Sequence, residues 1–412
     1  MSSDMRQEHY LDHAATTPMP PHVIEAWTDA ARLLAERPGN PASLHSGGRA
    51  ARRLLEDARE RIACALGADR AEVVFTSGAT ESDAIGVSGA ARSVYIANPH
   101  RHRVLISSLE HDAVLEQKKS LPHMGLSCEL LPVTYEGRTD VSVLSAPHMW
   151  DDIALVSMTY AASEVGTLQP VDELIDIRDR ACALGEDHTP QPGLPLIHTD
   201  AAQAVTTCDL NFRELGCDLL SIGGHKIGAP VGIGALLIRR GISVVSDRPG
   251  GGHERGIRSG TPDVAGAVTF ACALEYAVSE RERARVHAEK LRDHLVHGLS
   301  HTCAGRVSLT VPMDFSLPTI IHLSLPTRHP EALLLAMDSA GVHVSAGSAC
   351  HAGVTRPSEV LIRMGRSVDQ ALGVLRISTG KETSISDIDA FLAALPAALE
   401  AGIALDQLEG QK

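Results

Sequence analysis

Residues 195–226, PLIHTDAAQAVTTCDLNFRELGCDLLSIGGHK, hold two short apolar runs, and each run leads directly into residues that can do chemistry. The first run, 195–199, reaches Asp200, and the second, 219–222, is followed by a Gly-Gly turn and Lys226. Short apolar runs bounded by Pro, Gly or polar residues are typical of buried strands. Ligands in open α/β sheets bind beyond the carboxyl ends of the strands. The stretch therefore predicts a ligand site that includes Asp200.

Apolar runs of the same kind recur on both sides of this stretch, and helical patterns follow several of them. The further expected strands are Glu72–Thr76, Arg103–Ser107, Ile153–Met158 and Gly234–Ile238. The expected helices are Ala50–Leu66, Ala79–Ala91, Asp112–Ser120 and Val171–Ala183. Strands that alternate with helices predict an α/β fold with a mostly parallel sheet.

The pattern changes near Gly250–Arg258, where a Gly- and Arg-rich segment precedes a long amphipathic helical region at about Val264–Leu299. Shorter elements are expected after it, at Thr319–Ser324, Glu331–Ser339, Gly373–Ser378 and Ile385–Glu400. We therefore expect a second, smaller α+β domain. The expected division is an N-terminal arm at 1–20, a large domain at 21–262, a connecting helix at 263–298, a small domain at 299–405 and a frayed tail at 406–412.

Composition excludes several classes of protein. The 412 residues include 37 Lys and Arg against 51 Asp and Glu, and only 3% are aromatic. Such a chain has neither the positive field nor the stacking platforms of a nucleic-acid binder. The sequence has no run of 18 apolar residues and no apolar signal segment near its start, so we expect neither a membrane span nor a secretory leader. The eight cysteines are scattered without a CxxC pair, which predicts reduced thiols and a cytoplasmic protein.

Lys226 and Asp200 each allow a functional and a structural interpretation. A lysine that follows a buried strand is desolvated, and desolvation makes the amine a nucleophile suited to Schiff-base chemistry. The alternative is an ordinary surface lysine. Asp200 can pair with a heterocyclic cation, or it can cap a helix. A metal site at His198, Asp200 and His225 is a weaker alternative, because these residues lack a recognised ligand spacing.

Two further segments have the composition of anion sites. Residues 76–81, TSGATE, follow a strand and open a helix, which places free N–H groups and the helix dipole beside a phosphate. The same residues also fit a simple capping box. Residues 250–261, GGGHERGIRSGT, place two arginines among glycines, which suits anion binding, an interface or a solvated turn.

Cys350 and His111 complete the set of candidates. Cys350 lies in SAGSACHAG, residues 345–353, where small neighbours leave a thiol accessible and His351 favours its thiolate. His111 lies just past an expected strand. Each residue alone could equally be a spare loop thiol or a structural histidine. Together with the phosphate cradle, Asp200 and Lys226, they fit pyridoxal phosphate chemistry, in which a lysine holds the cofactor and an aspartate keeps its ring nitrogen charged.

The chain resembles the cysteine desulfurases, which are pyridoxal-phosphate enzymes of the class V aminotransferase group, in the subgroup with a long cysteine loop. The resemblance covers nearly the whole length and rests on the following segments: Tyr10–Pro18, Gly39–Ser43, Thr76–Glu81, Glu110–His111, His198–Gln203, Gly224–Lys226, Gly252–Thr261 and Ser345–Cys350. It implies a large domain with a mostly parallel sheet of the seven-stranded type, flanked by helices, plus a smaller α+β domain.

The resemblance also implies residue roles. Lys226 would bind pyridoxal 5′-phosphate and take the substrate Cα proton, and His111 would stack on the ring and assist proton transfer. Asp200 would pair with the ring nitrogen, and Gln203 would face the phenolic oxygen. The implied phosphate ligands are Ala79, Thr80, His225 and, from a neighbouring subunit, Thr261. Arg376 and Asn40 would bind substrate. Cys350 would accept sulfur from L-cysteine as a persulfide, leave L-alanine, and pass the sulfur to an acceptor protein such as an iron–sulfur scaffold or a thiolation protein.

The chain departs from the family pattern near the expected site. Ala162-Ser163-Glu164 replaces the usual Asn-Asn-Glu, Gly223 replaces a serine three residues before the lysine, and Ala346 replaces a serine before Cys350. The expected protein is a homodimeric cysteine desulfurase without a metal. The departures keep two alternatives open: a related lyase acting on selenocysteine or cysteine sulfinate, and a catalytically weakened relative that serves as a binding partner in sulfur transfer.

Overall fold

A seven-stranded sheet forms the centre of the larger part of the molecule. The computed structural model describes residues 8–183, 193–303, 305–346 and 356–409. The strand order is β2-β8-β7-β6-β5-β3-β4, and β8 alone runs antiparallel to its neighbours. The strands are β2 (Val73–Thr76), β3 (Arg103–Ser107), β4 (Ser127–Leu131), β5 (Ile153–Ser157), β6 (Leu196–Asp200), β7 (Leu219–Gly223) and β8 (Gly234–Ile238). The expected mostly parallel α/β fold with a seven-stranded sheet is confirmed.

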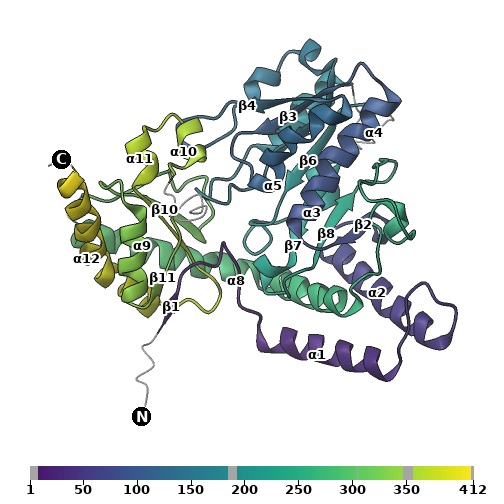
Figure 1. Cartoon of the computed structure of the whole chain (residues 1–412), viewed down its shortest axis with the longest axis horizontal. Coiled ribbons are helices and arrows are strands. Elements are labelled where there is room, and N and C mark those ends of the chain that lie inside the picture. The colour runs from purple at the N-terminus through teal and green to yellow at the C-terminus, as the bar shows by residue number, and fades with distance from the viewer. Residues whose placement is uncertain (1–7, 184–192, 304, 347–355, 410–412) are drawn as a thin grey trace.

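Helices cover both faces of this sheet (Figure 1). The helices of the larger part are α1 (Pro21–Glu36), α2 (Ser46–Ala65), α3 (Ala79–Ala84), α4 (Ala90–Ala97), α5 (Asp112–Leu115), α6 (Val171–Ala181) and α7 (Phe212–Leu215). A π-turn at Ile85–Gly89 joins α3 to α4. Alternate strand residues serve two separate cores: Ile197 and Leu220 pack in the core on one face, and Leu196 and Leu219 pack in the core on the other. We call this part the large lobe.

A second set of elements forms a small lobe with a core of its own. It contains the sheet β12-β10-β9 and the two-stranded pair of β1 and β11. Its strands are β1 (His9–Tyr10), β9 (Ser308–Leu309), β10 (Ile320–Ser324), β11 (Val342–His343) and β12 (Val374–Ser378). Its helices are α9 (Pro330–Ser339), α10 (Glu359–Arg363), α11 (Val368–Leu372) and α12 (Ile385–Glu409). The N-terminal arm belongs to this lobe because β1 pairs in parallel with β11.

Helix α8 (Val264–Thr302) runs from one lobe into the other (Figure 1). Asp263 caps its start by accepting a hydrogen bond from the Gly266 N–H at 2.9 Å. The first half of α8 places Phe270 in the large-lobe core, and the second half places Leu291 and Leu295 in the small-lobe core. One continuous helix is therefore shared between two hydrophobic cores.

Two of the differences between the structure and the sequence expectations have a clear physical reason. Strand β4 was not expected, because residues 127–131 lie at the sheet edge with three of the five residues exposed, and so lack the continuous apolar pattern of the other strands. The expectation that the chain frays from Asp406 is wrong for 406–409. Helix α12 continues to Glu409, and Asp406 accepts from the Arg328 Nε at 3.1 Å.

Among the described helices, only α12 has the length and apolar composition that would allow it to cross a membrane. Its residues Ile388, Phe391 and Leu395 are completely buried in the small-lobe core. Its apolar composition is therefore explained by packing against α8 and α9.

Candidate active site

The carboxyl ends of the parallel strands bring the predicted site residues to one edge of the large sheet. Strand β2 leads into the Ser77-Gly78 turn, β3 into Glu110 and His111, β6 ends at Asp200, and β7 ends at Gly223 just before Lys226. Neighbouring parallel strands end on the same side. This topology collects segments that are far apart in the chain.

Lys226 lies in a short 3-10 turn, Gly224–Ile227, directly after β7. Its ammonium donates hydrogen bonds to the Ala14 and Ala15 carbonyl oxygens, the second at 2.9 Å. Burial, reinforced by the charge of Arg376, lowers the pKa of Lys226 to about 8, against the opposing effect of Asp200. An amine with this pKa is partly unprotonated near neutral pH, as a nucleophile and proton acceptor must be.

Asp200 and Gln203 lie at the end of β6 on the same side of the site. The Asp200 carboxylate accepts a hydrogen bond from the Ala202 N–H at 2.8 Å, so it does begin a turn as a capping residue would. Burial raises its pKa, while that hydrogen bond and the charges of His111 and Lys226 oppose the rise. Gln203 donates to the Ala14 oxygen at 2.9 Å. Both Gln203 and Lys226 therefore contact the same carbonyl.

His111 is the N-cap of α5, and its Nδ1 accepts a hydrogen bond from the Ala113 N–H at 3.1 Å. A neutral ring in this arrangement carries its proton on Nε2. The side chain is otherwise exposed. A fixed ring with a free face is suited to stacking on a planar ligand.

The predicted phosphate cradle lies where the turn after β2 packs closely against the end of β7 and the start of β8. Gly78 has a φ of 148°, which favours glycine, and it precedes α3, whose first residues are Ala79 and Thr80. A Cβ added at Gly234 would lie 2.7 Å from the Gly78 Cα. A Cβ added at Gly223 would lie 3.3 Å from the Ala79 Cβ and 3.5 Å from the Ala79 nitrogen. Glycine at these positions keeps the turn close to the sheet and its helix-start amides open.

Charged residues hold the cradle in place from outside. The Glu81 carboxylate accepts from the Arg248 guanidinium at 2.6 Å and from the Arg258 Nε at 3.3 Å. Arg258 comes from the Gly-rich segment 250–261, so it binds a protein carboxylate rather than an external anion. In the same segment Glu254 receives two hydrogen bonds from Arg59, both at 2.7 Å. This segment therefore braces the cradle.

The remaining predicted ligands divide into two groups. His225 lies beside Lys226, and its Nδ1 is 3.2 Å from the Thr16 hydroxyl oxygen. Asn40 donates to the Thr261 hydroxyl at 3.5 Å within the same chain. In the described part of the chain, Asn40 and Thr261 make no hydrogen bond to the Lys226 side of the site, so their predicted roles stay predictions.

Arg376 extends from β12 of the small lobe toward the site. Its guanidinium donates to the Asp12 Oδ1 at 3.0 Å and to the Ser163 carbonyl oxygen at 2.9 Å. The buried Arg376 Nε has no hydrogen-bond partner among the described residues. Ser163 thus binds Arg376 through its backbone carbonyl. This contact does not depend on the side chain at position 163, so replacing the usual asparagine does not remove it. The neighbouring Glu164 carboxylate accepts a short hydrogen bond from Ser358.

Cys350 lies outside the described residues. The residues on either side of its segment are anchored at the site. The backbone of Ser345 forms a two-way bridge with that of Arg376, and Ser358 is tied to Glu164. The predicted nucleophile therefore belongs to a segment with both neighbouring ends beside the predicted substrate clamp.

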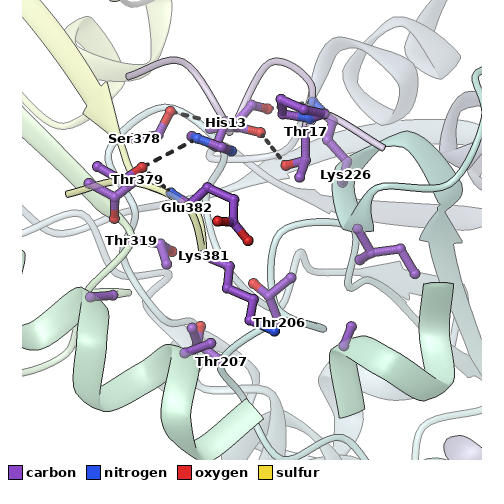
Figure 2. Close-up of a pocket in the computed structure, with 18 of the residues that line it drawn as sticks. His13, Thr17, Thr206, Thr207, Lys226, Thr319, Ser378, Thr379, Lys381 and Glu382 are labelled. Atoms are coloured by element: carbon purple, nitrogen blue, oxygen red, sulfur yellow. Dashed lines mark hydrogen bonds between the residues drawn. The ribbon is translucent and has the colours of Figure 1, made fainter. Parts of the chain in front are cut away.

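A cavity of about 400 Å³ lies between the lobes, and Lys226 and Gln203 form part of its wall. Figure 2 shows His13 from the N-terminal segment and Lys381 from the small lobe among the side chains around it. Burial lowers the pKa of His13 to about 4, so this ring is neutral. The reactive amine is thus positioned where both lobes and the N-terminal segment meet.

Sequence reasoning did not foresee the contribution of the N-terminal segment. The Ala14 and Ala15 carbonyls position Lys226, and the Asp12 carboxylate positions Arg376. Carbonyl groups are present at every residue, so no side-chain pattern could reveal the first contact. Asp12 lies inside the Tyr10–Pro18 motif, and its acidic side chain was the available signal for a cation partner.

The described residues fit pyridoxal phosphate. The predicted ring-nitrogen partner, Asp200, is a buried acid, the Lys226 amine is desolvated, and the predicted phosphate cradle is a glycine turn at a helix start. The loss of a side-chain hydroxyl at Gly223 leaves the backbone cradle intact. Within the same residues, no cluster of three or more His, Cys, Asp or Glu side chains could hold a metal ion.

Comparisons with known proteins agree with this chemistry. The aminotransferase class-V family model matches residues 9–391. An IscS-like cysteine desulfurase of Mycobacterium tuberculosis is 42% identical over 95% of this chain and 96% of that protein. A solved NifS-like protein superposes with a TM-score of 0.83 at 33% identity, covering 96% of this chain and all of the other. The structure of SspA in complex with cysteine gives a TM-score of 0.75 at 26% identity, over 92% of this chain and 100% of that one. The chain therefore belongs to the class-V aminotransferase family and, within it, to the cysteine desulfurases.

Proposed function

We propose that this protein is a pyridoxal-phosphate-dependent L-cysteine desulfurase that places the substrate sulfur on Cys350. The observation that carries the proposal is the placement of Lys226, a desolvated amine that follows β7 directly and is held by the Ala14 and Ala15 carbonyl oxygens. When bound, pyridoxal phosphate supplies an electron sink for negative charge at the substrate Cα. Every other requirement of the reaction is met by side chains of this chain.

The protein residues divide the work of binding. With pyridoxal phosphate bound, Asp200 would hold a negative charge toward the ring nitrogen, Gln203 would face the phenolic oxygen, and His111 would cover the ring. Thr80, Ala79 and His225 would hold the phosphate. Arg376 offers its guanidinium to the substrate carboxylate, and charged two-point contacts of this kind fix orientation as well as affinity.

Two groups move protons and sulfur. The Lys226 Nζ, with a pKa of about 8, accepts the Cα proton of cysteine near neutral pH. The Cys350 thiolate attacks the substrate sulfur, and the bond between that sulfur and the substrate Cβ breaks. The Cβ gains a proton, so the products are L-alanine and a persulfide on Cys350, and no external oxidant or reductant is needed. We propose that the persulfide sulfur then passes to an acceptor protein such as an iron–sulfur scaffold or a thiolation protein.

The experiment that tests the activity measures alanine and persulfide separately. Purified protein loaded with pyridoxal phosphate is given L-cysteine, alanine is quantified, and the intact mass is recorded. We expect alanine and a gain of one sulfur atom in wild type, and neither in Cys350→Ala. Cys64→Ala is the matched control, because Cys64 is an exposed thiol away from the site. Equal alanine production by Cys350→Ala and wild type would contradict the persulfide step.

We also propose a homodimer in which Thr261 reaches the phosphate of the neighbouring subunit. Within one chain, Thr261 is exposed and bonds only weakly to Asn40, which supports a role outside its own site. Light scattering on the loaded protein should give twice the chain mass. A monomer with full cofactor affinity would contradict this arrangement.

A further inference from the structure

A chain of buried polar groups lies behind Asp200, between the sheet and α3. The Ser157 hydroxyl donates to the Glu110 Oε1 at 2.9 Å, and its oxygen lies 2.9 Å from the His198 Nδ1. The His198 Nε2 lies 2.9 Å from the Ser221 hydroxyl oxygen. On the same side, the Asp83 Oδ1 is 3.6 Å from that Nε2. Except for Glu110, which follows β3, the partners come from β5, β6, β7 and α3.

The direction of these hydrogen bonds is set by the histidine. Burial lowers the pKa of His198 to about 3, so its ring is neutral and has one N–H. Because Ser157 donates to Glu110, its oxygen accepts from the His198 Nδ1–H. The Nε2 is then the acceptor of a hydrogen bond that the Ser221 hydroxyl donates. Ser221 therefore has no proton left to offer to Asp83.

Asp83 has no compensation for a negative charge. It is completely buried, and neither of its carboxyl oxygens accepts a hydrogen bond from a described residue. The titratable groups around it are Glu110 and Asp200, both acidic, and the neutral His198. Burial and the Asp200 charge raise the pKa of Asp83 well above its ordinary value. A Ser221 hydroxyl that donated to Asp83 would oppose this rise, but its proton is directed at His198.

Asp200 differs from Asp83 in two respects. It accepts the Ala202 N–H, and the positive charge of Lys226 acts on it. Of the carboxyl groups in this dry region, Asp200 is the one that a donor and a cation can stabilise as an anion. Like charges in close contact do not all ionise, so the protons are held by the others.

We propose that Asp83 is a positioning residue: as a neutral carboxylic acid it keeps its proton, donates a hydrogen bond to the Ser221 hydroxyl oxygen, and leaves the negative charge of the cluster on Asp200. This rests on the proposed function, because Asp200 is there the partner of the ring nitrogen. The role differs from catalysis, since Asp83 touches neither substrate nor cofactor. The proposed role requires that the Asp83 carboxyl group keeps its proton, and it does not require a negative charge at position 83.

The test compares a donor with an isosteric non-donor at position 83. Asp83→Asn keeps an N–H donor without a titratable group, and Asp83→Leu keeps the volume without a donor. We expect the pyridoxal phosphate dissociation constant of Asp83→Asn to lie within about twofold of wild type. We expect that of Asp83→Leu to rise about tenfold, with a shifted pH titration of the visible absorption of the bound cofactor. An equal loss in both variants would overturn the proposal, and so would no loss in Asp83→Leu.

Apoprotein unfolding provides a second readout that needs no cofactor. An ordinary aspartate in the unfolded chain loses its proton near pH 4, whereas folded Asp83 keeps it. The folded state therefore binds the extra proton, and wild-type stability falls as pH rises through this window. The stability of Asp83→Asn relative to wild type should increase from pH 4 upward. Parallel curves for the two proteins would overturn the proposal.

Thr199→Val is the matched control, because Thr199 lies on β6 between His198 and Asp200 but faces the other side of the sheet. Its hydroxyl donates to the Met158 carbonyl at 2.8 Å. We expect this variant to keep wild-type cofactor affinity and the wild-type pH dependence of stability. Wild type that binds no pyridoxal phosphate would contradict the proposed function instead, and would leave the apoprotein result interpretable.

Discussion

At the scale of single residues, the chemistry of the site depends on how far each charged group is buried and on which neighbouring charges raise or lower its pKa. Lys226 has acidic neighbours at Asp12 and Asp200, yet burial and Arg376 together outweigh them and lower its pKa. The same arginine is held by Asp12 in a position to meet a carboxylate. Under the proposed function, Arg376 would therefore act on both the Lys226 amine and the substrate carboxylate.

The first prediction concerns the pH dependence of covalent cofactor attachment to Lys226. With a pKa of about 8, the unprotonated fraction of the amine rises about tenfold between pH 7 and pH 9 and then levels off. Stopped-flow mixing of apoprotein with pyridoxal phosphate should show this rise in the attachment rate. A rate that continues to climb through pH 10, as for an ordinary lysine, would contradict the desolvation argument.

The second prediction concerns Arg376. Arg376→Lys keeps the charge but loses the fork that can bind two oxygens. Because a hydrogen bond to a charged group contributes about 1.5–3 kcal/mol, the KM for L-cysteine should rise roughly tenfold to a hundredfold, with a smaller change in kcat. Arg306→Lys, at an exposed pair with Glu400, is the control and should change neither constant. A fall in kcat without a change in KM would argue against a carboxylate clamp.

Much of the site was predictable at this scale, and the exceptions have physical reasons. Lys226, Asp200 and Gln203 follow strands whose apolar runs are visible in the sequence. The buried group of carboxyl side chains at Asp83, Glu110 and Asp200 was not foreseen, because the sequence around Asp83 has the polar composition of a surface helix. Only the fold reveals that this face of α3 packs on β6 and β7. Glu110 was seen as part of a motif and given no role.

At the scale of elements, the junction of α3 and α4 brings the helix close to the sheet. The π-turn Ile85–Gly89 interrupts the regular spacing, and such turns are frequent at functional sites. A Cβ added at Gly86 would lie 2.8 Å from the His198 Cδ2 and 3.0 Å from its Nε2. Glycine at this position allows the imidazole to lie flat in the helix–sheet interface.

The third prediction follows from this contact. Gly86→Ala should lower the free energy of unfolding of the apoprotein by roughly 1–3 kcal/mol, because the buried ring must move to admit the methyl group. Urea denaturation measures the change. Gly251→Ala is the control, since no atom lies within 4 Å of its added Cβ. A Gly86→Ala protein as stable as wild type would show that the ring has room to move.

Elements were predictable from sequence in proportion to their burial. The inner strands β5, β6 and β7 are buried along their whole length, so their apolar runs stand out. Strand β4 exposes most of its residues at the edge, and the two-residue strands β1 and β11 are too short to leave a pattern. Strands β1 and β11 pair with each other although they lie more than 300 residues apart in the chain.

At the scale of the whole molecule, α8 makes the two lobes mechanically dependent. Its ends lie in different cores, and its middle, near Arg283, is the least buried part. Helical hydrogen bonds of α8 therefore connect the two hydrophobic cores directly.

The fourth prediction is that the apoprotein unfolds in one cooperative transition. Fluorescence of Trp150, which is buried in the large lobe, and hydrogen exchange of β10 and β12 in the small lobe should give the same urea midpoint. Arg283→Pro breaks the helix at a cost of about 3 kcal/mol and should separate the midpoints. Arg283→Ala, at the same exposed position, should leave them together. Separate midpoints in wild type would contradict the shared-helix argument.

The parallel pairing of His9–Tyr10 with Val342–His343 also has a consequence for biosynthesis. On a ribosome that adds about 5–20 residues per second, the first strand waits on the order of half a minute before its partner emerges. The large lobe has all of its strands by then. The backbone oxygens that steady Lys226 come from the waiting segment, so the nascent enzyme acquires its finished amine environment only near the end of translation.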